Sequence, residues 1–147
     1  MEKHLENERV KIILRGPDLA DEAFILSTWL RGQRYGNQYF EDVDSDAYFA
    51  GQAERIKQIF TLPGISVQIA CNSEEQHQII GFIVYSGSTV HWVFVKKDYR
   101  NRGIARLLWR NLHFTTSSAT TKIGRALMRK FKIKFNPYIG ETYGKVA

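Results

Sequence analysis

The fold of this chain is decided by the stretch Val93-Phe94-Val95-Lys96-Lys97-Asp98-Tyr99-Arg100-Asn101-Arg102-Gly103-Ile104-Ala105. A β-branched, apolar run passes here through a charged turn into the start of a helix. A strand that leads into Arg-x-x-Gly-x-Ala directs several free backbone N–H groups and the positive end of a helix toward one spot. Gly103 lets the backbone approach a ligand closely, and Ala105 keeps the first helical turn small. The stretch therefore predicts an anion site that suits a pyrophosphate.

These residues resemble the acetyl-CoA-binding motif of the Gcn5-related N-acetyltransferases (GNAT). In that motif a hydrophobic strand is followed by Val-x-Pro-x-Tyr-Arg and then by Gly-x-Gly/Ala at the start of a helix. Lys97 stands where the family usually has proline. The residues that match the motif are Val95, Tyr99, Arg100, Gly103 and Ala105.

The resemblance implies an acetyl-CoA-dependent N-acyltransferase that passes the acetyl group directly to an amine, with no covalent enzyme intermediate. Amides of residues 100–106 would hold the pyrophosphate of coenzyme A, and the backbone of Val93 and Val95 would pair with its pantetheine arm. The residues expected to bind the cofactor are Val93, Val95, Arg100, Asn101, Arg102, Gly103, Ile104, Ala105 and Arg106.

The length of 147 residues, with 44% hydrophobic residues, suits one α/β domain with a real core. We expect residues 1–9 to be a flexible tail and residues 10–147 to form a single acyltransferase-like domain. No apolar run approaches the roughly 20 residues that cross a bilayer, and the N-terminus lacks the pattern of a signal peptide, so we expect a cytoplasmic protein without membrane contact. Cys71 lies in an apolar run and is expected to be buried filler. The four histidines are dispersed, so we expect no metal site.

The resemblance implies a GNAT-like α/β (α+β) fold, with a central, mixed, mostly antiparallel sheet flanked by about four helices. Gly32 and Gly36 are expected to break the chain after the first helix. The predicted order is β-α-α-β-β-β-α-β-α-β, which is also the element order of the family that the chain resembles. The expected strands cover residues 10–15, 65–71, 79–85, 89–95, 113–117 and 132–136, and the expected helices cover residues 18–33, 45–60, 102–112 and 119–131.

Charge is divided unevenly along the chain. Residues 1–95 hold 8 Lys and Arg against 13 Asp and Glu, whereas residues 96–147 hold 13 against 2. The basic C-terminal half would attract an anionic cofactor, nucleic acid, or both, although a solvated helix face is an equally good interpretation. The residues Lys122, Arg125, Arg129 and Lys132 have the spacing of one helix face.

The catalytic groups are less clearly marked. The strand over residues 89–95 has no acid, and His91 is its one titratable side chain. A pKa near the ordinary value of about 6.5 would let His91 act as a general base, although a core histidine with satisfied hydrogen bonds is the commoner case. The tyrosine that usually serves the family as acid is replaced by Met128, so Tyr138 is the candidate acid. Ser117 and Ser118 could hold the cofactor or a water, or simply cap the following helix.

The resemblance implies an acceptor site between the first two helices, at Arg31, Arg34, Tyr35 and Tyr39. These aromatic and cationic side chains could stack on a base or cover an apolar acceptor, and they could equally pack under the loop. The acidic run over residues 41–46 favours a cationic amine, on a small molecule or a protein. Two alternatives stay open. One is a phage-type enzyme that modifies nucleic-acid bases on the same fold, and the other is a GNAT-like binding protein without catalysis.

Overall fold

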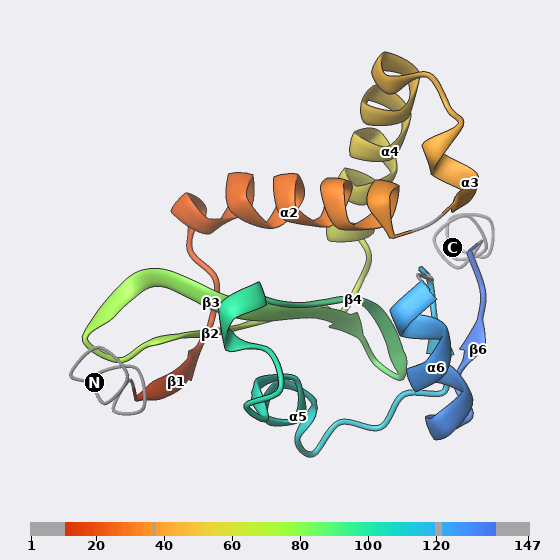
Figure 1. The fold of residues 1–147 in the computed structure, drawn as a ribbon. Coiled ribbons are helices and arrows are strands. Elements are labelled where there is room, and N and C mark those ends of the chain that lie inside the picture. The colour runs from red at the N-terminus through yellow and green to blue at the C-terminus, as the bar shows by residue number, and fades with distance from the viewer. Residues whose placement is uncertain (1–10, 37, 120–121, 138–147) are drawn as a thin grey trace.

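The computed structural model describes residues 11–36, 38–119 and 122–137. In this part of the chain a six-stranded sheet has its strands in sequence order (Figure 1). Neighbouring strands are antiparallel from the first to the fourth, and the last two pairs are parallel. The mixed, mostly antiparallel sheet predicted from the sequence is confirmed. The strands are β1 Ile12–Arg15, β2 Ile65–Asn72, β3 Glu75–Ser86, β4 Thr89–Val95, β5 Thr116–Ser117 and β6 Lys134–Phe135.

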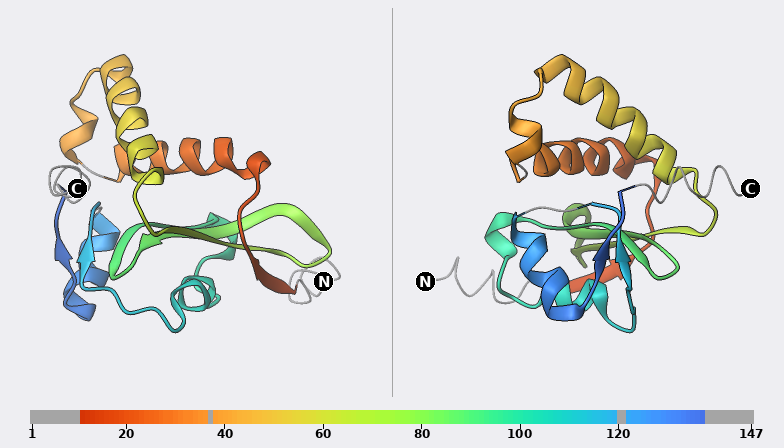
Figure 2. Two further views of the ribbon diagram at one scale, coloured as in Figure 1. Left: turned by 180° about the vertical axis from the view of Figure 1, so that it is seen from behind. Right: turned by 90° about the vertical axis from the view of Figure 1, so that its right-hand side faces the viewer.

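Helices cover both faces of the sheet, with α2 and α4 above it and α5 beneath it in Figure 1. Figure 2 shows α6 on the same side as α5, beside the two short strands. The helices are α2 Glu22–Tyr35, α3 Gln38–Glu41, α4 Ser45–Phe60, α5 Ile104–Trp109 and α6 Lys122–Phe131, with single 3₁₀ turns η1 Leu19–Asp21 and η2 Lys97–Tyr99.

The predicted boundaries hold best where apolar patterns are long. β4 and α4 occupy the predicted ranges. β3 starts at Glu75, earlier than expected, because its polar first residues pair with β2 in an exposed hairpin that has no apolar alternation. The helix expected over residues 102–112 is shorter, since Gly103 adopts a left-handed conformation with φ 80° and precedes α5. Lys132 also has a positive φ of 57°, so it lies beyond α6 and the predicted four-residue basic helix face is wrong.

The prediction that Gly32 breaks the first helix is wrong as well. α2 continues to Tyr35 and ends where the Gly36 N–H bonds the Gly32 carbonyl. A Cβ atom at position 32 would lie 2.9 Å from Cζ2 of Trp92, so glycine is needed to admit the indole ring. That ring stacks on Trp29 with a centroid distance of 5.9 Å and an interplanar angle of 16°. Gly32 therefore serves the packing of α2 on β4.

Two apolar cores lie on opposite faces of the sheet. The first joins α2 and α4 to side chains such as Ile69 and Phe82, and it includes Cys71, which is fully buried and free as predicted. The second joins α5 to side chains such as Ile80 and Ile83. Because successive strand residues point to opposite faces, the near-continuous apolar runs of β2 and β3 supply both cores.

A buried ion pair fastens the start of α2 to β1. The Arg15 guanidinium donates to both carboxylate oxygens of Asp21, at 2.7 and 3.0 Å, and also to the backbone carbonyl of Gln76. Asp21 accepts from the Asp18 N–H in a capping box. The hydrogen bonds from Arg15 hold the pKa of Asp21 below its ordinary value. The pair thus ties three elements together at one corner of the sheet.

Gly81 is the position in β3 where the fold least tolerates a side chain. A Cβ atom there would lie 2.6 Å from the Phe94 carbonyl oxygen and 3.4 Å from both Ile104 and Leu108 of α5. We therefore expect Gly81→Ala to cost on the order of 2 kcal/mol or more of unfolding free energy, measured by urea denaturation.

Gly51 supplies the matched control, because it lies in α4 with nothing within 4 Å of its Cβ position. Gly51→Ala should stabilise the protein by about 0.5–1 kcal/mol through helix propensity. Equal effects of the two substitutions would contradict the packing described for β3, β4 and α5.

Candidate active site

The sheet opens where β4 and β5 part. The two strands pair only at Thr89 with Thr116 and at Val90 with Ser117, and the Ser118 N–H then donates to the Val90 carbonyl at 3.1 Å. Beyond that bond, the described part of the chain after β5 makes no further pair with β4. We call this point the strand fork. From it to Val95, β4 pairs with β3 on one side, and none of the described strands pairs with its other edge, which we call the free edge.

A β-bulge places His91 at the strand fork. Val84 of β3 pairs with Trp92, whereas the next residue, Tyr85, pairs with Val90, so His91 is an extra residue on β4. A bulge bends its strand and turns a side chain away from the regular alternation. The bend and the departure of β5 thus occur at the same residue.

The His91 ring is buried, with 1% of its surface exposed, and both of its nitrogens have partners. Nδ1 lies 2.6 Å from Oγ of Ser118, and Nε2 lies 2.8 Å from Oγ of Ser86. Ser118 is itself 4% exposed, whereas Ser86 at the end of β3 is half-buried. A chain of three side chains therefore runs from the rim of the hairpin to the strand fork.

The expected pKa of His91 near 6.5 is corrected by this environment. Burial, with a smaller contribution from the positive charge of Arg55, lowers its pKa to about 4. A neutral imidazole has one N–H donor and one acceptor nitrogen, which match two serine hydroxyls. His91 is therefore neutral at physiological pH, and any part it plays in catalysis has to start from the neutral ring.

The predicted anion site lies at the other end of the free edge, where β4 leads through η2 into residues 100–106. The first bond of α5 runs from the Leu107 N–H to the Gly103 carbonyl, so the amides of residues 104–106 point out of the helix. The Cβ position of Gly103 has nothing within 4 Å, which leaves room for a ligand against the backbone. Arg100 donates from Nε to the Val95 carbonyl at 3.0 Å, which ties the turn to the end of β4.

The rest of the predicted cofactor set follows this turn. Asn101 has a positive φ of 64°, and Arg102 stacks its guanidinium over the Tyr99 ring at 5.5 Å. Ile104 is buried against the sheet, and Ala105 and Arg106 are exposed beside the free amides. The structure therefore gathers the predicted residues at one end of β4, with Val93 and Val95 on the strand that leads there.

The predicted acceptor residues do not form one group. Arg34 is half-buried, lies over the Tyr48 and Phe49 rings at 5.1 and 5.7 Å, and donates to the Val43 carbonyl. Arg34 therefore stabilises the connection between α3 and α4. Arg31 and Tyr35 are exposed on α2, and Tyr39 belongs to α3, which the sequence did not predict. The candidate acid Tyr138 lies outside the described residues.

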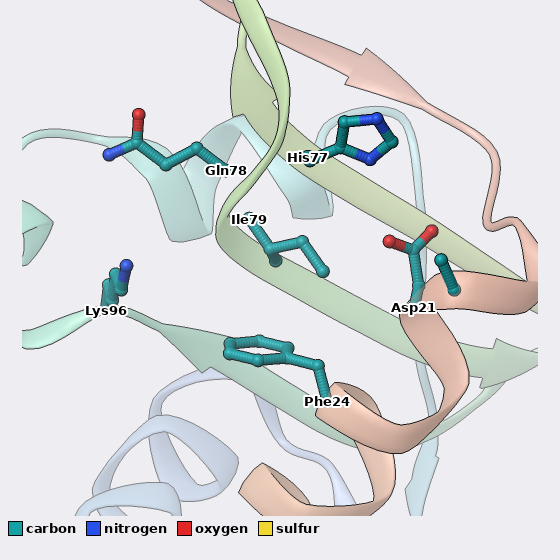
Figure 3. Close-up of a pocket in the computed structure, with 7 residues that line it drawn as sticks. Asp21, Phe24, His77, Gln78, Ile79 and Lys96 are labelled. Carbon is teal, nitrogen blue, oxygen red and sulfur yellow. The ribbon is translucent and has the colours of Figure 1, made fainter.

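Figure 3 shows a pocket of about 260 Å³ at the loop end of β4, on the side of the sheet that carries α2. Phe24 and Ile79 form its apolar wall, and Asp21 and Lys96 line it from different elements. Asp21 already has its charge matched by Arg15. The pocket is thus a depression beside the candidate site, with no unpaired buried acid.

Sequence reasoning missed Ser86, which is not among the site residues predicted from the sequence. Its hydrogen bond with His91 depends on the β-bulge, and no local sequence pattern predicts that bulge. Met128 of α6, in place of the family's usual tyrosine, is partly buried and packs against the second apolar core. Among the described residues no three His, Cys, Asp or Glu side chains gather as a metal site requires, and no helix there is long and apolar enough to span a membrane.

Residues 68–122 match the family model described as "Acetyltransferase (GNAT) domain". A proposed acetyl transferase from Pyrococcus furiosus has a similar fold, with a TM-score of 0.59 and 10% identity over 92% of this chain and 91% of that one. A proposed acetyltransferase from Bacillus subtilis aligns with a TM-score of 0.54 and 9% identity over 86% and 80% of the two chains. No curated protein sequence matches this chain.

A GNAT-family acetyltransferase from Staphylococcus aureus aligns with 20% identity and a TM-score of 0.48 over 69% of this chain and 63% of that one, so this chain spans less than two thirds of that relative. The matched segment runs from β2 through the strand fork and residues 100–106 to the start of α6. Residues 68–122 thus match the GNAT acetyltransferase domain, and the chain has a fold similar to that of solved acetyltransferases.

The buried neutral His91 predicts a loss of stability in mild acid. Its folded-state pKa of about 4 lies below the unfolded value near 6.5. The stabilising contribution is therefore complete above about pH 6.5 and is lost as the pH falls toward about 4, by an amount on the order of 3 kcal/mol. Urea denaturation at a series of pH values measures it.

A His91→Gln variant cannot titrate at this position and should lose most of that pH dependence, whatever its stability at neutral pH. A His77→Gln variant removes an exposed histidine and should retain it. The same dependence in the His91→Gln variant would show that other groups cause it.

Proposed function

We propose that this protein is an acetyl-CoA-dependent N-acetyltransferase. The observation that carries the proposal is the free edge of β4, which starts at the strand fork and ends at the open turn of residues 100–106. A ligand with an anionic end and a long arm of amide groups matches an edge of this kind. Acetyl-CoA supplies an activated acetyl thioester at the far end of such an arm.

The residues present fit coenzyme A in both shape and charge. Gly103 leaves open space against the backbone where a pyrophosphate would lie, and the neighbouring amides lack helical partners. The exposed cations Arg100, Arg102 and Arg106 surround the turn. Backbone groups of Val93 and Val95 would hold the arm as an added strand holds an edge. The thioester would then lie toward the strand fork.

An acceptor amine would approach from the side of the sheet that carries α2 and α4. The exposed acids Glu41, Asp42 and Asp46 lie in or beside α3 and the first turn of α4. α4 reaches across to the short strands, because Arg55 donates to the Pro137 carbonyl just after β6. The negative charge at α3 and the start of α4 favours a cationic amine. We propose such an amine, on a small molecule or a protein, as the acceptor.

The comparisons give no support to a nucleic-acid acceptor, and the exposed basic side chains Arg129, Lys130 and Lys134 need no partner to be stable in solvent. A binding protein without catalysis is distinguished by product. Incubation with isotope-labelled acetyl-CoA and a panel of diamines, followed by mass spectrometry, should give acetylated amine and free coenzyme A in equal amounts. Cofactor binding without either product would instead indicate a binding protein.

The cofactor site predicts the effect of a substitution at Gly103. A Gly103→Val side chain would fill the open space at the turn, so we expect coenzyme A affinity measured by calorimetry to fall at least about 100-fold. Gly64→Val is the matched control, since Gly64 has a similar φ of 75° and an equally open Cβ position at the turn before β2.

Both substitutions introduce the same backbone strain, and both should lower stability by a similar amount. Only Gly103→Val should weaken binding. Unchanged affinity in a folded Gly103→Val protein would remove the cofactor from this turn.

A further inference from the structure

We infer that Ser118 is the proton donor to the coenzyme A sulfur, supplied through the neutral ring of His91 from Ser86. This inference rests on the proposed function, since it requires the thioester at the strand fork. The structure provides the three side chains in hydrogen-bond contact, at 2.6 Å from Ser118 to Nδ1 and 2.8 Å from Ser86 to Nε2.

Ser118 lies at the strand fork. Its N–H donates the last hydrogen bond of the β4–β5 ladder, to the Val90 carbonyl, so Ser118 is the last residue before the two strands part. Ser117, one residue earlier, uses its hydroxyl on the Ala119 carbonyl at 2.7 Å and is thereby committed to the turn. The Ser118 hydroxyl has His91 as its side-chain partner and retains one further hydrogen-bonding direction.

The direction of the hydrogen bonds decides the chemistry. When the proton of His91 is on Nδ1, that N–H donates to Ser118, and the Ser118 hydroxyl is free to donate toward the sulfur. Nε2 then accepts from the Ser86 hydroxyl, which is half-buried and can exchange with water. When the proton is on Nε2 instead, Ser118 donates to His91 and has no proton for a ligand. The inference therefore requires the Nδ1–H tautomer while acetyl-CoA is bound, before transfer.

The transfer balances through this chain. The amine lone pair forms the C–N bond and the C–S pair leaves on sulfur, which takes the Ser118 proton. Ser118 recovers a proton from Nδ1 of His91, Nε2 takes the Ser86 proton, and Ser86 is reprotonated by water. The proton lost by the amine goes to water, so the products are the amide and the free thiol. The ring stays neutral throughout and ends with its proton on Nε2; after coenzyme A leaves, proton exchange with water restores the Nδ1–H form for the next turnover.

Nitrogen-15 NMR of the acetyl-CoA complex, prepared without an acceptor amine, tests the tautomer directly. A variant with His4→Gln, His77→Gln and His113→Gln leaves His91 as the one histidine signal, and none of these three residues belongs to the proposed site. We expect the Nδ1–H form in the complex. A complex that contains mainly the Nε2–H form would overturn the inference.

The thiol of bound coenzyme A gives a second readout, followed by the ultraviolet absorbance of the thiolate. A hydrogen bond from Ser118 favours the thiolate, so Ser118→Ala should raise the thiol pKa in the complex by about one unit. Ser117→Ala is the control and should leave it unchanged. An equal thiol pKa in wild type and Ser118→Ala would overturn the inference while the cofactor site stands. A wild-type protein that binds no coenzyme A would overturn the proposed function itself.

Discussion

Because β5 pairs with β4 over only two residues, the sheet changes from a continuous ladder to an open edge in the middle of the domain. The bulge at His91 and the departure of the chain after Ser118 occur at this place. Backbone groups left without partners are costly when they are buried, so an edge inside a domain needs either solvent or a ligand. The features that suggest a cofactor site follow from this one interruption of the sheet.

The remainder of the scaffold holds β4 in place while its edge is free. On one face, Trp92 is fixed between Trp29 and the backbone of Gly32. On the other, α5 packs against Gly81, where a side chain would separate helix and sheet. The same α5 carries the turn of residues 100–106, so the packing that orders the core also positions the proposed phosphate site. Rigid support of this kind is what a binding edge requires.

Much of the fold could be predicted from the sequence, because β4, α4 and the motif around Gly103 are marked by local patterns. What could not be predicted depends on contacts between distant residues. Gly32 has the local character of a breaker, yet a tryptophan in another element requires it inside a helix. From the sequence alone His91 is a candidate general base. In the fold its ring is buried and neutral, and it is hydrogen-bonded to Ser86 and Ser118. Burial and the β-bulge depend on the tertiary structure, and they determine the protonation state and the hydrogen-bond partners of His91.

The uneven distribution of charge connects the cofactor site with the state of His91. Positive charge in the C-terminal half favours an anionic ligand, and the positive charge of Arg55 on α4 opposes protonation of the buried ring. If His91 stayed protonated in order to act as an acid, it would have to overcome both the cost of burying a charged ring and the repulsion from Arg55. A ring that remains neutral while it passes a proton avoids that cost, and it does so beside groups that stabilise a developing thiolate. The arrangement therefore favours a His91 that passes a proton from Ser86 to Ser118 while it remains neutral, rather than a His91 that is already protonated before the reaction.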